Sequence, residues 1–147
     1  MKKYFMLFAV AAGLTTATFA QKEEKENKKK IDPPAAVKAA FAKQFPGSTA
    51  KWEEEHGKYE ASFKHMNHEM SALFTAAGTM EESEMEVKTN ELPMAVTAYV
   101  NQHHKGAAIK EAAKITKANG EVNYEAEVKG KDLIFDASGK FLKEVKD

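Results

Sequence analysis

Neither cysteine nor arginine occurs in this chain of 147 residues. Without cysteine there can be no disulfide framework, no thiolate metal site and no thiol nucleophile. Without arginine the chain lacks the side chain that best recognises phosphate or carboxylate groups through two parallel hydrogen bonds. The 22 lysines are balanced by 22 aspartates and glutamates, so the formal net charge is zero. We therefore expect no nucleic-acid partner, because binding to a phosphate backbone requires clustered positive charge.

Long apolar runs are also absent, except at the N-terminus. Lys2 and Lys3 precede an apolar run over residues 4–14, and small residues lead to Ala20. This layout is typical of a secretory signal peptide over residues 1–20, cleaved near Ala20. The run is shorter than the roughly 20 residues that a membrane-spanning helix needs, so we expect no membrane insertion after cleavage. The sequence therefore predicts a periplasmic or secreted protein.

Residues 21–31 read QKEEKENKKKI and carry no apolar periodicity. Such a segment cannot bury enough surface to offset the entropy lost on ordering, so it is interpreted as a charged flexible tether. Removal of Lys2 and Lys3 leaves 20 lysines (22 − 2) against 22 acids, which is a net charge of −2 for the exported chain. A single folded domain is expected over residues 32–147.

Apolar residues spaced three and four apart predict two helices, one ending at Pro46 and one over about 91–104. Asp32 is expected to cap the first helix, with two prolines at its entry. Elsewhere the apolar period changes to two, as in Tyr59, Ala61 and Phe63, which predicts strands with one buried face. We expect strands near 48–56, 58–65, 69–75 and 79–87, and again near 108–118, 121–129, 131–136 and 140–146.

The two halves of the chain resemble each other. The segment PAAVKAAF at residues 34–41 matches PMAVTAYV at 93–100, an offset of 59, and Tyr-Glu-Ala at 59–61 matches 124–126 at an offset of 65. The offset changes only where turns are expected, as a duplicated fold predicts. We therefore predict an α+β fold of two tandem repeats, 32–90 and 91–147. Each repeat contains a helix followed by four strands, with both helices on one face of an antiparallel sheet and the other face open.

The same segments carry a family resemblance. AAVKAAFAKQFPGSTAKW, GKYEASF and LFTAAG, followed by ELPMAVTAYVNQHHKGAAI, VNYEAEV and LIFDASG, resemble the PepSY-like, beta-lactamase-inhibitor-protein-like family of small exported proteins, found mainly in Bacteroidota. The resemblance covers nearly all of residues 32–147. It implies a periplasmic or exported domain of two repeats, with helices packed on a concave antiparallel sheet. It implies no enzyme chemistry, and inhibition follows only by analogy of fold.

A partner would contact the open face of the sheet in this interpretation. Alternation predicts that this face exposes Glu60, Ser62, Lys64, Ser71, Leu73, Thr75, Asn123, Glu125, Glu127 and Ile134. The face lacks the aromatic and arginine anchors that lead tight interfaces, so a polar, salt-sensitive partner is favoured. Trp52, the single tryptophan, either packs under the first helix or faces the open side. In the second case it is the best candidate for a partner contact.

The histidines offer a metal-binding alternative. His65, His68 and Glu69 lie close together in sequence, but at a predicted hairpin tip where a solvated turn is the simpler interpretation. Copper binding is a further alternative, because the thioether sulfur of methionine is a soft ligand and the chain has Met66, Met70, Met80 and Met85. Methionines more often fill gaps in apolar cores. The segment 136–139, Asp-Ala-Ser-Gly, is better explained as a turn than as a calcium loop.

No catalytic constellation is recognisable. The serines lack a Gly-x-Ser-x-Gly elbow, and no glycine-rich phosphate loop occurs. The sequence therefore predicts a non-enzymatic exported binding domain that needs no cofactor. We expect a protein-interaction role in the periplasm, in which the domain binds an unidentified periplasmic or extracellular protein and could inhibit an enzyme. The alternative is a carrier of a small ligand or metal ion.

Overall fold

The structure is a computed structural model that describes residues 31–146. The predicted signal peptide, residues 1–20, and the tether up to residue 30 lie outside the described residues. The sheet is formed by β1 (Ala50–Glu55), β2 (Lys58–His65), β3 (His68–Thr75), β4 (Met80–Glu86), β5 (Glu111–Lys117), β6 (Val122–Glu127), β7 (Lys131–Asp136) and β8 (Phe141–Lys146). Helix α1 (Ala35–Gln44) precedes β1. The 3-10 turn η1 (Thr89–Glu91) and helix α2 (Met94–His103) lie between β4 and β5.

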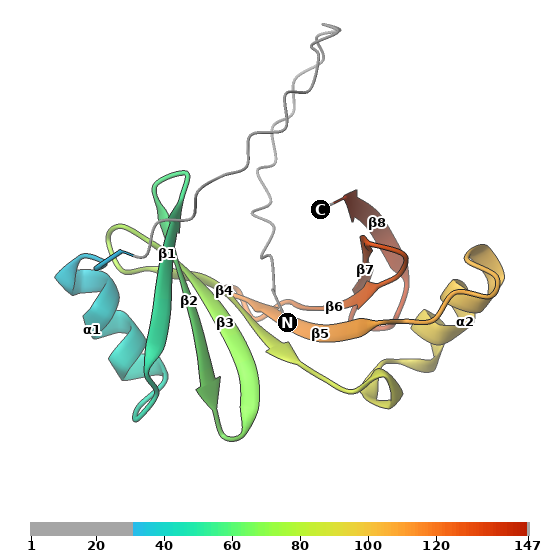
Figure 1. Ribbon diagram of the computed structural model, residues 1–147, viewed down its shortest axis with the longest axis horizontal. Coiled ribbons are helices and arrows are strands. Elements are labelled where there is room, and N and C mark those ends of the chain that lie inside the picture. Colours follow the sequence, from blue (N-terminus) through green and yellow to red (C-terminus); the bar gives the residue numbers. More distant parts are fainter. Residues whose placement is uncertain (1–30, 147) are drawn as a thin grey trace, which may run out of the picture.

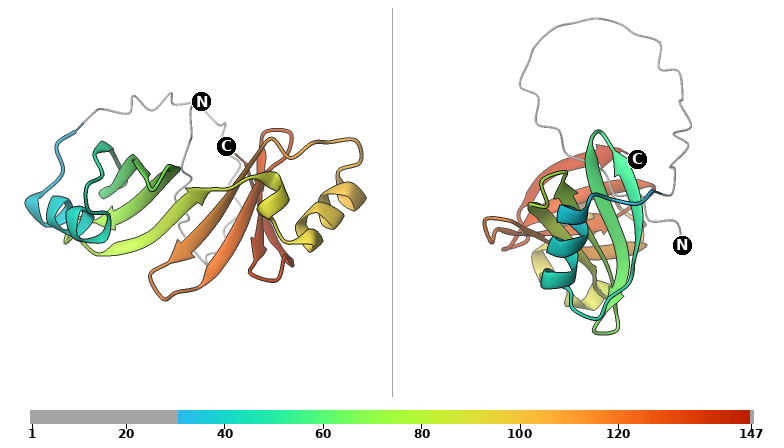
Figure 2. Two further views of the ribbon diagram at one scale, coloured as in Figure 1. Left: turned by 90° about the horizontal axis from the view of Figure 1, so that it is seen from below. Right: turned by 90° about the vertical axis from the view of Figure 1, so that its left-hand side faces the viewer.

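All the strands form one antiparallel sheet, in which spatial order follows sequence order from β1 to β8. Figures 1 and 2 show α1 and α2 at opposite ends of the sheet and on the same side of it. The predicted α+β class, the helix followed by four strands in each half, and the placement of both helices on one face are therefore confirmed. Within residues 31–146, no helix combines the length and the hydropathy that a membrane span requires.

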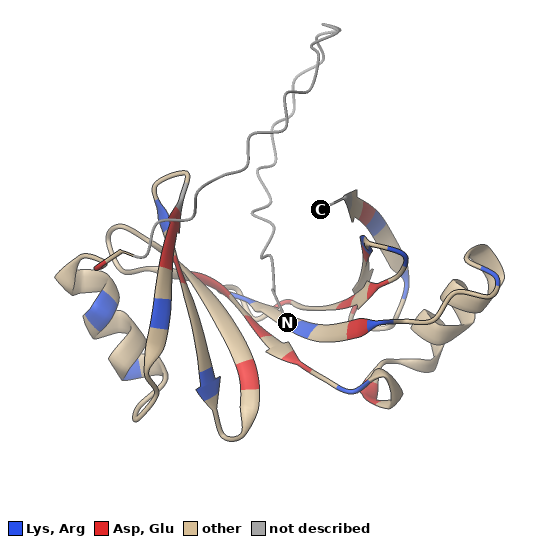
Figure 3. Cartoon of the chain, in the orientation of Figure 1, with Lys and Arg blue, Asp and Glu red and all other residues tan. Residues whose placement is uncertain are grey.

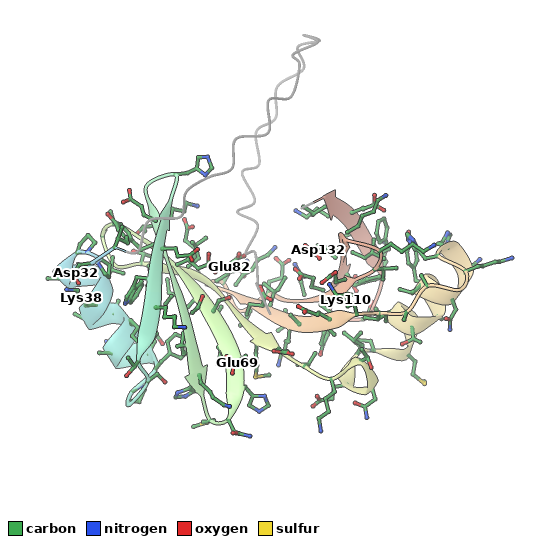
Figure 4. The ribbon with its side chains drawn as sticks, viewed as in Figure 1. Asp32, Lys38, Glu69, Glu82, Lys110 and Asp132 are labelled. Atoms are coloured by element: carbon green, nitrogen blue, oxygen red, sulfur yellow. The ribbon has the colours of Figure 1, made fainter. Side chains whose placement is uncertain are left out.

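The helices begin differently from the prediction. Pro34 and Pro93 occupy the N-cap positions, and neither helix has a side-chain cap. The expected cap at Asp32 is wrong, because α1 starts after Pro34 and the Asp32 carboxylate instead pairs with the Lys38 ammonium at 2.5 Å (Figure 4). The prolines set the backbone for helix entry and lose no hydrogen bond there, since the first N–H groups of a helix have no internal partner.

Turn lengths and strand lengths both contribute to the drift in the repeat offset. Residues 56–57 join β1 to β2, whereas residues 118–121 make the equivalent connection between β5 and β6. The β2–β3 turn uses Met66 and Asn67, with φ angles of 47° and 68°. Two positive φ values are typical of the two-residue turns whose twist matches that of the flanking strands. The longer turn of the second repeat raises the offset, as the duplicated pattern predicts, whereas the offset then decreases because β6 and β7 have six residues each and β2 and β3 have eight.

Each helix covers a separate apolar core on the same face of the sheet, which we call the helix face. The first core joins Val37 and Phe41 of α1 to buried residues of β2 and β3, including Phe74. The second joins Val96 and Val100 of α2 to Ala126, Val128, Leu133 and Phe135. Val37 and Val96 are both fully buried and lie 59 positions apart, so the repeat seen in the sequence is also a repeat of packing.

Candidate functional site

The sheet face turned away from the helices is rich in carboxylates. Figures 1 and 2 show that the sheet curves, with the helices on its outer side, so we call the opposite side the concave face. Residues that lie opposite each other in neighbouring strands point to the same face, so the strand register shows which residues belong to the concave face. They include Lys51, Glu53, Glu60, Ser62, Lys64, Glu69, Ser71, Leu73, Glu82, Glu84, Glu86, Glu111, Ala113, Ile115, Lys117, Asn123, Glu125, Glu127, Asp132, Ile134 and Lys143. Figure 3 shows acidic positions along the central strands.

Curvature brings distant strands together across this face. In a flat sheet β4 and β8 would lie about 19 Å apart, at about 4.8 Å per strand. Yet the carboxylate of Glu82 on β4 and the ammonium of Lys143 on β8 affect each other's pKa. Burial and the nearby Lys117 lower the pKa of Lys143, while Glu82 opposes that shift. Figure 4 shows Glu82 and Asp132 on the hollow side of the sheet.

No helix within residues 31–146 covers the concave face, yet several residues of this face are buried. Leu73 is 4 % exposed and Ile134 is 2 % exposed, and the buried members also include Glu60, Ser71 and Asn123. The prediction that these residues are solvent-exposed is therefore wrong. Alternation places them correctly on the face but does not reveal the curvature of the sheet, which brings the long side chains of neighbouring strands over them.

The predicted partner-binding residues fall into three environments. Glu60, Leu73 and Ile134 are buried in the floor of the concave face. Glu125 and Glu127 are half-buried, and the Glu127 carboxylate accepts a hydrogen bond from the Lys110 ammonium at 3.1 Å. Lys64 is exposed and pairs with Glu69 at 3.8 Å. The structure therefore places these residues on one face without making all of them accessible.

Trp52 lies on the helix face. It is opposite Ala61 in the β1–β2 ladder and is half-buried. Its ring meets Phe41 edge-on at a centroid distance of 5.3 Å and lies 6.0 Å from Phe74. The interpretation that Trp52 packs under the first helix is confirmed, so this residue is not part of the concave face.

The sequence interpretation missed the contribution of the central strands to this face. Glu82, Glu84 and Glu86 of β4 all lie on the concave face, opposite Leu73, Ser71 and Ala113. The signal was present in the sequence, because these glutamates occur at every second position and alternate with Ser83 and Met85. The prediction used alternation only where one set of residues was apolar.

Glu82 experiences opposing electrostatic effects. Burial, the largest effect, raises its pKa above the ordinary value of 4.5, while Lys117, which lies opposite Glu82 in the β4–β5 ladder, lowers it. A raised pKa means that the folded state binds the proton more tightly than the unfolded state. The free energy of unfolding therefore decreases as pH rises from 4.5 through the higher pKa of the folded state.

We expect Glu82→Gln to raise the thermal midpoint at pH 7, because the neutral amide avoids the cost of a charge that is partly removed from water. The gain should vanish below pH 4.5, where the wild-type carboxyl is protonated in both states. Thermal unfolding monitored by circular dichroism between pH 3.5 and 7 measures this difference. Equal midpoints for the two proteins at pH 7 would contradict the prediction.

Glu121 is the matched control of opposite sign. Its pKa is lowered, first by the hydrogen bond from Lys117, whose ammonium lies 2.9 Å from the carboxylate. The ionised Glu121 carboxylate therefore stabilises the folded state at pH values above its ordinary pKa of 4.5. This stabilisation is lost as pH falls through the lowered pKa of the folded state. Glu121→Gln should lower the midpoint at pH 7 and have no effect at low pH.

The histidine candidates do not converge with the carboxylate. His65 and His68 are opposite each other on the helix face, whereas Glu69 lies on the concave side of the same hairpin. The His65 Nδ1 atom is 2.9 Å from the Ser48 hydroxyl oxygen, and the ring lies 5.7 Å from that of Phe45. Among residues 31–146, no group of three or more histidine and acidic side chains is arranged to hold a metal ion.

The Asp136 segment forms the turn between β7 and β8. One carboxylate oxygen, Oδ1, accepts hydrogen bonds from the backbone N–H of Ser138, the hydroxyl of Ser138 and the backbone N–H of Lys140. These bonds, led by the Ser138 hydroxyl, lower the pKa of Asp136. The preference for a turn over a calcium loop is consistent with this geometry, because the carboxylate stabilises its own turn.

Comparisons with solved structures identify the fold. A BLIP-like protein from Bacteroides fragilis superposes with a TM-score of 0.62 at 28% sequence identity, covering 78% of this chain and 86% of that chain. A candidate periplasmic protein from Bacteroides eggerthii gives a TM-score of 0.71 at 15% identity, over 78% of this chain and 88% of that one. The resemblance to BLIP-like proteins is therefore confirmed in three dimensions.

A DUF2874 family protein from Bacteroides uniformis also shares the fold. Its TM-score is 0.68 at 18% identity, with 76% of this chain and 87% of that chain covered. No protein-family model and no curated protein sequence matches the chain. The structural neighbours thus include BLIP-like and candidate periplasmic proteins, and the Bacteroides eggerthii and Bacteroides uniformis proteins, at 15% and 18% identity, establish a shared fold and nothing more.

Proposed function

We propose that this chain is an exported, non-enzymatic binding domain that acts as a periplasmic protein-interaction module and inhibits an enzyme. The observation that carries the proposal is the concave, carboxylate-rich face that runs across both repeats. A helix covers each half of the opposite face, so the concave face is the broad surface left for a partner. Residues 1–20 act as the export signal and residues 21–31 tether the single domain, 32–147.

The partner presents a polar, positively charged surface in this proposal. Carboxylates outnumber lysines among the members of the concave face, and every aromatic side chain of the strands lies on the helix face. Interfaces without aromatic or arginine anchors lack the usual energetic hot spots. Charge complementarity then governs association, so binding is salt-sensitive and its rate falls as ionic strength rises.

The inhibitory part of the proposal is supported by the 28% identical BLIP-like protein, which aligns over most of both chains. Export is supported by the N-terminal pattern at residues 1–20 and by the periplasmic assignment proposed for the Bacteroides eggerthii neighbour. The preference for a positively charged partner is supported by the carboxylates of the concave face. These three components can be tested separately.

The sharpest test uses two adjacent glutamates of β1. Glu53 lies opposite Glu60 and therefore on the concave face, whereas Glu54 lies opposite Tyr59 on the helix face. The wild-type protein, immobilised and exposed to periplasmic extract, should retain a stoichiometric partner that 0.5 M salt releases. Glu53→Lys should reduce that retention, because it places a positive charge against a positive partner. The matched variant Glu54→Lys introduces the same charge on the other face and should leave retention unchanged.

Inhibition is then measured directly on the captured enzyme. Addition of wild-type protein should lower the rate of substrate turnover, and Glu53→Lys should require a higher concentration for the same effect. A panel of purified β-lactamases with a chromogenic substrate provides a defined first set of targets. Equal retention by both variants would exclude the concave face as the binding surface, and retention without any loss of turnover would exclude inhibition.

A further inference from the structure

Two methionines that are far apart in sequence are neighbours in the sheet. Met70 of β3 and Met85 of β4 lie directly opposite each other in the ladder and point to the helix face. Facing side chains of an antiparallel pair have Cβ atoms about 4.5–5.5 Å apart. The two thioether sulfurs can therefore approach a common point above the sheet.

His68 adds an imidazole to the same place. It precedes Met70 by two residues on β3, so it points to the same face at a distance of about 6.8 Å along the strand. Its diagonal separation from Met85 is then about 7–8 Å, within reach of long side chains. His68 is exposed, and no hydrogen bond or ion pair joins its imidazole to another residue of the described chain.

From this arrangement we propose that His68, Met70 and Met85 form a binding site for Cu(I), which we call the Met70–Met85 cluster. Thioether sulfur is a soft ligand that selects Cu(I), and imidazole is a common partner ligand for copper. The proposal is independent of the protein-interaction role, because it uses the helix face of the sheet and not the concave face.

The surroundings favour a singly charged soft ion over a divalent one. The acidic neighbours in sequence, Glu69, Glu84 and Glu86, alternate onto the concave face and leave the cluster without a carboxylate. Lys114 lies opposite Met85 on β5, and its positive charge would repel Zn²⁺ more strongly than Cu(I). Divalent ions also prefer carboxylate or imidazole ligands to thioether sulfur.

The packing of the two methionines bears on whether they bind a metal ion or only fill space in an apolar core. Met70 packs against the first core, but Met85 is a member of neither core although it is half-buried. Met85 belongs to β4, which together with β5 forms the centre of the sheet, where the two repeats join. A methionine there contributes little to either core, so its sulfur can serve a bound ion at small cost to packing.

Chelator competition tests the site. The intact protein is titrated with Cu(I) under anaerobic, reducing conditions, in the presence of a coloured Cu(I) chelator whose absorbance reports the copper it retains. Wild-type protein should withdraw one equivalent of copper. Met85→Leu, Met70→Leu and His68→Gln should each weaken binding by at least about tenfold, because even the loss of a group that merely orients a metal ligand costs 10- to 100-fold in affinity.

Leucine has nearly the volume of methionine, so these variants should keep their fold, which circular dichroism will verify. Met94→Leu is the matched control, since Met94 lies at the start of α2 and is 89 % exposed. This variant should bind copper like wild type. In methyl NMR spectra, Cu(I) should shift the Met70 and Met85 ε-methyl signals and leave that of Met94 in place.

Two results would overturn the proposal. One is that the chelator keeps all of the copper in the presence of wild-type protein. The other is that Met85→Leu binds copper as tightly as wild type, which would place the ion elsewhere on the chain. Because Met85 lies outside both cores, this second comparison remains decisive even if Met70→Leu fails to fold.

Discussion

Replacement of Phe74 by alanine should lower the free energy of unfolding by about 3–5 kcal/mol, the usual cost of deleting a buried aromatic ring. Phe74 is fully buried in the first core. Its ring lies 6.4 Å from that of Phe41 and 6.0 Å from that of Trp52, so its removal leaves a cavity between α1 and the sheet. Denaturant unfolding followed by tryptophan fluorescence measures the loss.

Trp52 makes this measurement local, because it is the single tryptophan of the chain and contacts the same core. Met66→Ala provides the control, since Met66 is 82 % exposed at the β2–β3 turn and its replacement should change stability by no more than about 0.5 kcal/mol. A loss below about 1 kcal/mol for Phe74→Ala would show that the first core does not carry the stability assigned to it.

Gly78→Ala should destabilise the protein by about 2–5 kcal/mol, which combines the backbone cost of a positive φ with the cost of overpacking. Gly78 has a φ of +84°, and a Cβ at this position would lie 2.6 Å from the carbonyl oxygen of Ala36 in α1. The clash is with backbone, so the first turn of the helix would have to move.

Gly47→Ala isolates the contribution of the clash. Gly47 has a similar φ of +77°, but nothing lies within 4 Å of its hypothetical Cβ. This variant should therefore lose only the backbone term, about 1–2 kcal/mol. Chemical denaturation of both variants gives the difference, and equal losses would mean that the contact between the β3–β4 turn and α1 is unimportant.

The same contact occurs in the second repeat. A Cβ at Gly139 would lie 2.9 Å from the Ala95 Cβ and 3.1 Å from the Pro93 Cβ. Gly78 and Gly139 are 61 positions apart, and Ala36 and Ala95 are 59 apart. Each repeat therefore positions its helix entry against the turn between its third and fourth strands, and glycine is required there for close approach as well as for backbone conformation.

Local patterns were sufficient to predict most of the fold. The buried side of a strand follows from alternation, as at Tyr59, Ala61 and Phe63. The buried side of a helix follows from spacings of three and four residues, as between Val37 and Phe41. Both patterns can be recognised within a few residues. The repeat offsets then revealed how the elements are ordered. Asp32 is not the cap because Pro34 occupies the N-cap position and the helix starts two residues later than a cap at Asp32 requires. Both Asp32 and Pro34 are suited to a helix start, and composition alone does not show which of them occupies the N-cap.

Properties that depend on the whole sheet could not be predicted in this way. Burial of Leu73 and Ile134 on the concave face arises from curvature accumulated over many strands. The pairing of Met70 with Met85 depends on the β3–β4 register, which shifts between Leu73 and Phe74. A one-residue change in register reverses the face of a side chain, so a bulge that is invisible in the sequence decides which residues meet.

The presence of a separate core in each repeat has a consequence for how the molecule opens. The backbone ladder that joins the halves runs between β4 and β5, while the apolar clusters lie on either side of that seam. Each repeat thus resembles a cooperative unit with its own free energy of opening. Amide hydrogens of one repeat can then exchange with solvent while the other repeat stays folded, so protection from exchange falls into two levels along a single continuous sheet.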